Sequence, residues 1–473
     1  MMICKKCKRN VRDYLKTCPY CGYKFGSVTK SPKQSTGTGE NEYMIAKNYY
    51  YGIGGEKDLK EAFNWYMKAA VKGHIDAQYK LGCMYDNGEG VKEDKKEALA
   101  WYLKAAEKGN ISAQGKLGYM YFYGKGVNIN KKEAFSWYMK AAVKGQKNAQ
   151  YNLGYMYDNG EGVAKDKGEA FKWYMKAAKQ NHLEAQYKVG EAYYYGHGVE
   201  EDEKKAFYWY LLAAEKNHVK SQYVVGEAYY YGHGVKEDDA EAFKWYMKAA
   251  EQGNVEAQYS VGYMYSRGQG VEEDKAEAVT WFMKAALHKH VSAQYEVGQA
   301  HYYGKGVWKD YERAFSWYMK AAENNHLDAQ YSIGFMYSHG QGVEKDQGEA
   351  FDWYLKAALQ NQVFAQYEVG KAYYYGNGVW KDYDEAFTWY MKAAEQDYSA
   401  AQFSIGQMFF NGEGVEEDKE QAFTWYMKAA ENGNAVAQYS VGQMYFYGEG
   451  VERDLIDALC WYKRAVKNGY NAK

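Results

Sequence analysis

The sequence predicts an all-α protein, a solenoid of about twelve two-helix repeats. The first observation is a 36-residue period: Ala-Gln recurs ten times between Ala77 and Ala437, and a Ser-Gln pair at Ser221 completes the series. The second is a Gly-x-Gly sequence in all twelve units. The third is a tryptophan at one position of every unit, from Trp65 to Trp461. The expected array covers residues 41–473.

The first helix of each unit is predicted from apolar spacing. Ala77, Leu81 and Met84 recur at three- and four-residue steps, which is typical of a helix with one buried face. The helix is expected to end at Asn87, because glycine at Gly88 tolerates the left-handed turn that closes a helix. The Gly-x-Gly sequence lies between two helices and follows no strand, so we interpret it as a turn and not as a phosphate-binding loop.

The second helix is predicted to begin at Asp94 and to end near Lys108. Eleven units have Asp at this first position and the twelfth has Asn130, and such side chains accept hydrogen bonds from the free N–H groups of a first helical turn. Eight units carry Glu three residues later, as at Glu97. That spacing predicts a capping box, in which the Glu side chain bonds back to the first residue.

Small residues predict that the helices pack closely. Gly82 lies inside the first helix and eleven units keep Gly there, although glycine inside a helix costs about 1 kcal/mol relative to alanine. Close approach of a neighbouring helix is the expected compensation. Opposite the small residues we expect the repeated tryptophan, such as Trp101, to fill the space.

Histidine recurs in one register just after the second helix. Neighbouring copies would stand about 10 Å apart for each helix layer, which is too far for shared metal ligation. We therefore predict turn or capping histidines at His74, His182, His218, His290 and His326.

Four of the six cysteines form two Cys-x-x-Cys pairs near the N-terminus. Two such pairs can close a tetrahedron around zinc, and so short a segment needs metal for its folding energy, on the order of 10 kcal/mol. The pattern resembles the small zinc ribbons found at the N-termini of many bacterial proteins. It predicts a structural zinc ribbon over residues 1–26 with the ligands Cys4, Cys7, Cys18 and Cys21.

The N-terminal segment has two other interpretations. Residues 1–33 hold nine Lys or Arg against one Asp, so nucleic-acid or ribosome-associated binding through the ribbon is an alternative function. The Cys-Pro-Tyr-Cys run at Cys18 also matches a glutaredoxin-type redox motif, but the βαβ context of that motif is missing. Residues 27–40 are rich in Ser, Thr and Gly and predict a flexible linker.

Composition predicts the cellular setting. No apolar run is long enough to cross a membrane, and no apolar signal-peptide core follows Met1. Few cysteines, grouped as in metal sites, fit a reducing compartment, so we expect a cytoplasmic protein. The array after residue 33 is net acidic, since the whole chain carries −1, and it has no general attraction for nucleic acid.

One stripe of the first helix varies while the structural positions stay constant. In the unit that begins at Ala77 the stripe consists of positions 80, 83 and 87, which follow one another as i, i+3 and i+7 and share a face of the helix. First helices usually line the concave, binding side of a solenoid. Tyrosine and charged side chains there suit a protein or peptide partner. The predicted partner-binding residues are Tyr119, Tyr123, Tyr155, Glu191, Tyr195, Glu227, Tyr231, Tyr263, Gln299, Phe335 and Lys371.

The complete repeat motif is specific enough to suggest a family. Ala-Gln-x3-Leu-Gly-x2-Tyr, then Gly-x-Gly-Val, then Ala-Phe/Leu-x-Trp-Tyr-x-Lys-Ala-Ala resembles the Sel1-like repeat family, relatives of tetratricopeptide repeats, over residues 41–472. The resemblance implies an α/α right-handed superhelix and a scaffold or adaptor role. Some relatives with a cysteine pair in each repeat are linked to β-lactam binding or hydrolysis, and this chain lacks those pairs.

We therefore expect a non-enzymatic scaffold that binds a protein or peptide on the concave face and carries a structural zinc site. A catalytic group should interrupt the periodicity, and no Ser-His-Asp or Cys-His set does so. A cell-wall-related enzyme is the least favoured alternative.

Overall fold

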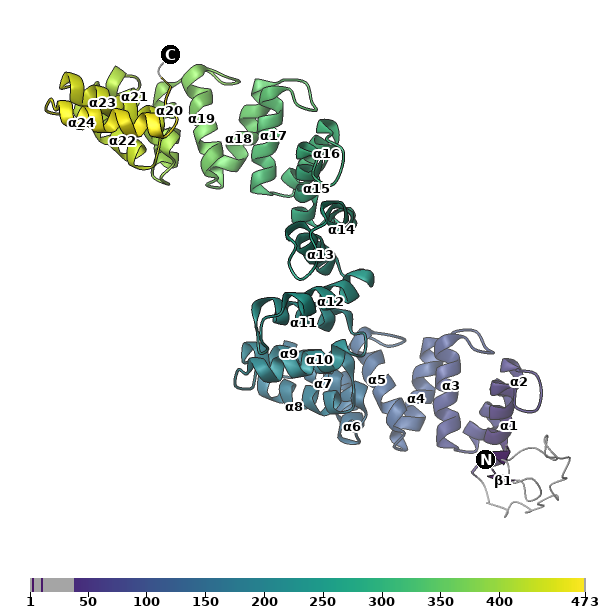
Figure 1. Ribbon diagram of the computed structural model, residues 1–473. Coiled ribbons are helices and arrows are strands. Elements are labelled where there is room, and N and C mark those ends of the chain that lie inside the picture. Colours follow the sequence, from purple (N-terminus) through teal and green to yellow (C-terminus); the bar gives the residue numbers. More distant parts are fainter. Residues whose placement is uncertain (1, 4–9, 12–37, 472–473) are drawn as a thin grey trace. The chain divides into compact units, whose positions relative to one another are not determined.

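The computed structural model describes residues 2–3, 10–11 and 38–471 of the 473-residue chain (Figure 1). Two short strands, β1 (Met2–Ile3) and β2 (Asn10–Val11), form an antiparallel pair. The four cysteines of the predicted zinc ribbon and most of the predicted linker lie outside the described residues. The chain divides into two compact units, Met1–Glu200 and Glu201–Lys473.

In the first unit, every helix packs on its neighbours along the chain. The two-helix repeat is confirmed here: a first helix, a Gly-x-Gly turn and a second helix follow one another with the 36-residue period. The helices are α1 (Glu40–Tyr51), α2 (Leu59–Val71), α3 (Ile75–Asn87), α4 (Lys95–Glu107), α5 (Ile111–Tyr123), α6 (Lys131–Val143), α7 (Lys147–Asn159), α8 (Lys167–Lys179) and α9 (Leu183–Tyr195).

The second unit repeats the same arrangement, with each helix packed on its neighbours within the unit. Its helices are α10 (Glu203–Ala214), α11 (Val219–Tyr231), α12 (Asp239–Glu251), α13 (Val255–Arg267), α14 (Lys275–Leu287), α15 (Val291–Tyr303), α16 (Tyr311–Glu323), α17 (Leu327–His339), α18 (Gln347–Leu359), α19 (Val363–Tyr375), α20 (Tyr383–Ala394), α21 (Ser399–Asn411), α22 (Lys419–Glu431), α23 (Ala435–Tyr447) and α24 (Leu455–Lys467).

The second helices begin as predicted, with one correction. The Asp94 carboxylate accepts hydrogen bonds from the backbone N–H groups of Lys96 and Glu97, at 2.9 and 3.0 Å. The capping box is wrong, because the backbone N–H of Asp94 donates to the Tyr85 carbonyl at 3.0 Å and not to the Glu97 side chain. The start of this second helix is thus tied to the last turn of the first helix before it.

The aromatic ring that packs on the small residue of the first helix is a tyrosine, not the predicted tryptophan. A Cβ atom at Gly82 would lie 2.5 Å from two ring atoms of Tyr102 in the same repeat. Gly118 and Gly154 meet Tyr138 and Tyr174 in the same way. The absence of a side chain at these glycines therefore lets the second helix lie against the first, with a tyrosine ring between them.

The tryptophan joins each repeat to the one before it. Trp101 of α4 packs in the core formed by α1, α2 and α3, together with Leu81 and Met84. Lys104 covers the outer face of this indole, with Nζ 3.9 Å from a ring centroid, a favourable cation–π geometry. The tryptophan is therefore core, as predicted, but it seals the junction between repeats.

The glutamine of each Ala-Gln pair also links neighbouring repeats. Gln78 Nε2 donates to the Ala70 carbonyl at 3.0 Å, and Gln114 donates to Ala106 at the same distance. These carbonyls belong to the last turn of the preceding second helix, where backbone acceptors lack helical partners. A buried amide thus satisfies the end of one helix from the start of the next.

Candidate partner-binding face

The variable stripe of the first helices is where the predicted partner-binding residues lie. Its last position is the residue just before the Gly-x-Gly turn, and the side chains there are strongly exposed. Where this position holds tyrosine, between 54% and 66% of the residue is exposed. We call these residues the tyrosine row: Tyr51, Tyr123 and Tyr195 in the first unit and Tyr231, Tyr303, Tyr375 and Tyr447 in the second.

In the first unit, the structure brings three predicted residues together. Tyr119 lies 4.7 Å from Tyr123, measured between ring centroids. Phe122 lies 4.8 Å from Tyr123 and 6.1 Å from Tyr155 of α7. The result is an aromatic patch that extends across α5 and α7, with Tyr119, Tyr123 and Tyr155 exposed.

In the second unit, two predicted residues share a pocket. Tyr231 of α11 and Tyr263 of α13 line a hollow of about 200 Å3 together with Tyr230 and Tyr259. The guanidinium of Arg267 lies 4.6 Å from the centroid of the Tyr263 ring. This pocket offers ring faces to a ligand.

Other predicted residues at the middle position of the stripe have partners within their own helix. Glu227 accepts a hydrogen bond from Tyr223 at 2.9 Å, and burial raises the pKa of this carboxyl above its ordinary value. Gln299 Nε2 donates to the Tyr295 hydroxyl at 2.7 Å.

The remaining predicted residues are half-buried or paired in the same manner. Lys371 forms an ion pair with Glu368 at 2.9 Å, and Lys188 pairs with Glu191 at 2.6 Å. The Phe335 ring stacks on a histidine one helical turn further along. Many side chains at the middle position of the stripe therefore bond or stack within their own helix. The exposed end of the stripe is the tyrosine row.

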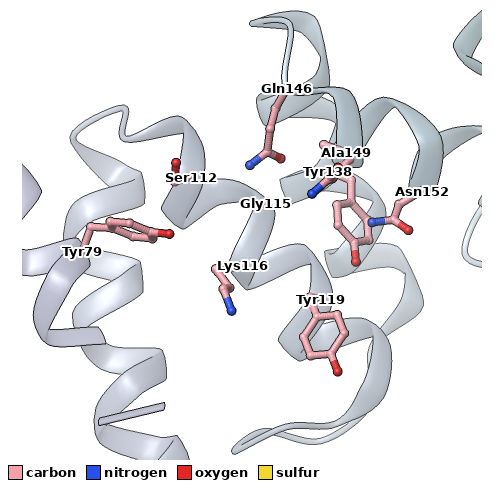
Figure 2. A pocket seen from close by; sticks show the side chains of 10 residues that line it. Tyr79, Ser112, Gly115, Lys116, Tyr119, Tyr138, Gln146, Ala149 and Asn152 are labelled. Atoms are coloured by element: carbon pink, nitrogen blue, oxygen red, sulfur yellow. The ribbon is translucent and has the colours of Figure 1, made fainter. Parts of the chain in front are cut away.

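A pocket of about 310 Å3 opens beside the aromatic patch of the first unit (Figure 2). Its lining comes from α3, α5, α6 and α7 and includes Tyr79, Lys116, Tyr119 and Tyr138. Gly115 lies at its centre, with Gln146 and Asn152 on the α7 side. Of these residues, only Tyr119 belongs to the predicted set.

Some exposed residues were missed. Tyr303, Tyr375 and Tyr447 share the exposure of the tyrosine row, and their signal in the sequence was the recurrence of tyrosine just before Gly-x-Gly. Trp308 and Trp380 follow Gly-x-Gly-Val and are 93% and 92% exposed. Their signal was a tryptophan outside the periodic register, in the two Val-Trp-Lys-Asp-Tyr sequences.

The capping histidines are confirmed. His74 Nδ1 accepts a hydrogen bond from the backbone N–H of Ala77 at 3.2 Å, and its ring stacks on Tyr43 of the preceding repeat at 4.2 Å. His182 bonds Ala185 in the same way.

Within residues 38–471, no group of three or more His, Cys, Asp or Glu side chains is placed to hold a metal ion. None of the helices described is both long and apolar enough to cross a bilayer.

Comparison with solved structures supports this description. The crystal structure of c5321, a protective antigen of uropathogenic Escherichia coli strains with an SLR fold, is 33% identical with a TM-score of 0.79, and the match covers 91% of this chain and 92% of that one. A Sel1 repeat protein from Oxalobacter formigenes is 32% identical with a TM-score of 0.52, over 65% of this chain and 90% of that one. None of the curated proteins compared with the chain matches it.

The repeats themselves match one family model. Sel1 repeats are recognised at residues 42–74, 75–110, 111–145, 147–182, 183–218, 219–254, 255–290, 291–326, 327–362, 363–398, 399–434 and 435–470. These twelve segments correspond to the helix pairs of the structure, and the chain belongs to the Sel1 repeat family.

Proposed function

We propose that this protein is a non-enzymatic scaffold that binds a protein or peptide along the stripe of its first helices. The tyrosine row is the observation that carries the proposal. A tyrosine offers a large, rigid apolar surface and a hydroxyl, and tyrosine is enriched among the residues that dominate binding energy at protein interfaces. Exposed aromatic side chains that recur at one position of the repeat mark a surface that a partner would cover.

Each compact unit contributes its own surface. In the first unit, the row adjoins the patch formed by Tyr119, Phe122 and Tyr155. In the second, it adjoins the pocket that Tyr231 and Tyr263 line. Exposed large apolar groups that gather in this way mark interaction sites. The Sel1 repeat fold, an array of two-helix units, agrees with a scaffold role.

The test compares two variants of the full chain in affinity capture from a lysate of the source organism. In the row variant, Tyr123, Tyr195, Tyr231 and Tyr303 are changed to serine. In the control variant, four exposed aliphatic residues at the ends of second helices, each between 65% and 73% exposed, are changed to serine: Val71, Val143, Leu287 and Leu359.

We expect the native chain and the control variant to retain the same partner and the row variant to lose it. Loss of one such contact typically costs about 1–2 kcal/mol or more, so four together abolish capture at micromolar concentrations. Circular dichroism checks that all three proteins are equally helical. Equal capture by the row variant would show that partners bind elsewhere.

The N-terminal zinc site remains a prediction. Cys4, Cys7, Cys18 and Cys21 would supply four thiolates, which is a closed structural set for zinc. Metal analysis of the purified full chain should give one zinc ion per molecule. The Cys4→Ser/Cys7→Ser variant should give none, and equal zinc in both proteins would contradict the assignment.

A further inference from the structure

One position of the first helix departs from an otherwise constant pattern. Two residues after each Ala-Gln alanine, eleven units carry an aromatic residue and one carries glycine, at Gly115. The aromatic residues are Tyr43, Tyr79, Tyr151, Tyr187, Tyr223, Tyr259, Tyr295, Tyr331, Tyr367, Phe403 and Tyr439.

The ring at this position has a defined place in the other repeats. Tyr151 lies 5.6 Å from the ring of Tyr174, the same tyrosine that packs on Gly154. On its other side it stacks on the capping residue His182 at 4.6 Å. In ten described repeats, the corresponding ring lies between 5.2 and 5.8 Å from its partner on the second helix.

In the repeat with Gly115, a pocket lies at the place of the ring. Tyr138, the equivalent of Tyr174, is only 2% exposed and lines the 310 Å3 pocket. Figure 2 shows Tyr138 on one side of Gly115 and the side chain of Gln146 above it. The pocket is therefore bounded by Tyr138 and Gln146, the equivalents of the two residues that hold Tyr151 in the next repeat.

The capping residue of this repeat also differs from the histidine beside Tyr151. The N-cap of α7 is Gln146, whose side chain makes no cap hydrogen bond. Its amide occupies the part of the ring's place next to the backbone, so that a Cβ atom at Gly115 would lie 2.2 Å from its Oε1. That oxygen is buried and has no hydrogen-bond partner among the described residues. A buried acceptor without a donor costs free energy, which a ligand that brings a hydroxyl would recover.

We propose that the Gly115 pocket receives a tyrosine side chain from the bound partner, in place of the ring that the repeat lacks. The geometry favours an aromatic occupant because ten other repeats hold a ring against the aromatic residue that corresponds to Tyr138, and four of these rings also stack on a capping histidine. It favours tyrosine over phenylalanine because the amide of Gln146 and the side chains of Ser112 and Asn152 give the lining hydrogen-bonding groups. Lys116 already pairs with Asp86 at 3.4 Å, so the pocket has no unpaired cation to select an anion.

This inference rests on the proposed scaffold function, because it assigns one anchor residue to the partner. An aromatic side chain that fills a preformed pocket is typical of the residues that dominate interface energies. Tyr119 lines the pocket, and it adds exposed aromatic surface beside the inserted ring together with Tyr155 of the same patch.

The test uses 4-fluorophenol as a probe for the tyrosine side chain, titrated with the full-length chain and followed by 19F NMR line broadening. The native chain should bind it with a millimolar dissociation constant. The variant Gly115→Tyr/Gln146→His restores the arrangement of the neighbouring repeat and should bind at least about tenfold more weakly. The variant Tyr151→Gly opens an equivalent place in the next repeat and should bind a second probe molecule. Circular dichroism and thermal melting verify that each variant is folded.

Equal binding by the native chain and Gly115→Tyr/Gln146→His would overturn the proposal, as would no binding by the native chain. If the probe does not bind but the row variant still loses its partner, the pocket assignment fails and the scaffold function stands. If the probe binds in the Gly115 pocket but the row variant captures its partner as well as the native chain does, the scaffold function fails and the pocket remains.

Discussion

Two adjacent repeats of the first unit, residues 111–145 and 147–182, differ at one internal ring. In the second of them, Tyr151 is held between Tyr174 and His182. In the first, the equivalent positions hold Gly115 and Gln146 around an open pocket. Both repeats have two helices of 13 residues, so the pair allows the contribution of one aromatic side chain to stability and to binding to be compared within one chain.

The largest expected effect comes from emptying the filled repeat. Tyr151→Gly removes a half-buried ring and places glycine inside a helix, and together these should lower the free energy of unfolding by about 3 kcal/mol. Urea denaturation followed by circular dichroism at 222 nm measures the loss. No change in the urea midpoint would mean that the ring contributes nothing to the repeat.

The next effect comes from the glycine that faces the second helix. A Cβ atom at Gly154 would lie 2.5 Å from the ring of Tyr174, so Gly154→Ala should destabilise the chain by about 2 kcal/mol. Gly118→Ala should cost less, because Tyr138 can move into the open pocket whereas Tyr174 is held by Tyr151.

A matched control exists in the same repeat. Gly168 lies in the first turn of α8, and a Cβ atom there would meet only Asp166 Oδ1, at 3.3 Å. Gly168→Ala should therefore leave stability unchanged or raise it slightly. Equal losses for the alanine variants at Gly118 and Gly154 would show that the open pocket gives Tyr138 no freedom.

Filling the open repeat should have a smaller effect of opposite sign. Gly115→Tyr/Gln146→His adds a ring and removes a glycine from α5, and it should stabilise the chain by about 1 kcal/mol. A rise in the thermal midpoint measures this gain. A fall would show that the backbone of this repeat has closed around the gap and no longer accepts a ring.

The smallest effect is a pH dependence that the filled repeat has and the open repeat lacks. Burial, with a further contribution from Lys147, lowers the pKa of His182, so the folded chain favours the neutral imidazole. Its stabilising contribution is complete above the unfolded pKa of about 6.5 and is lost as pH falls through the lower folded value.

His182→Asn isolates that contribution, since Asn110 performs the same capping role at α5 without titrating. The urea midpoints of the native chain and the variant should differ less at pH 5.5 than at pH 7.5. A difference that is constant over this range would contradict the assignment.

Most of the fold could be predicted from the sequence because the repeat displays each constraint about a dozen times. The period, the caps at Asp94 and its equivalents, and the turn at Gly-x-Gly all followed from residue type and spacing. The partner of Gly82 did not: tyrosine and tryptophan are adjacent on the second helix, and only the packing shows that Tyr102 faces the glycine while Trp101 faces the preceding repeat.

The candidate site was less accessible to sequence reasoning. The variable stripe led to Tyr123, Tyr195 and Tyr231, which are exposed, but it also led to Glu227 and Lys371, whose partners lie within their own helices. The glycine at position 115 is visible in the sequence as one missing aromatic residue. Its meaning depended on knowing that a ring normally occupies a place between two walls, which requires three-dimensional contacts.

The hydrogen bond from Gln78 to the Ala70 carbonyl has a consequence for how such arrays change in length. At each junction the glutamine of the later repeat donates and a backbone carbonyl of the earlier repeat accepts, and every repeat carries both groups. Excising or duplicating any block of 36 residues therefore joins matching halves, whereas a cut of any other size leaves a buried amide facing the wrong backbone. Genes that encode such chains can expand or contract in whole repeats, and the pocket at Gly115 would travel with its repeat as a unit.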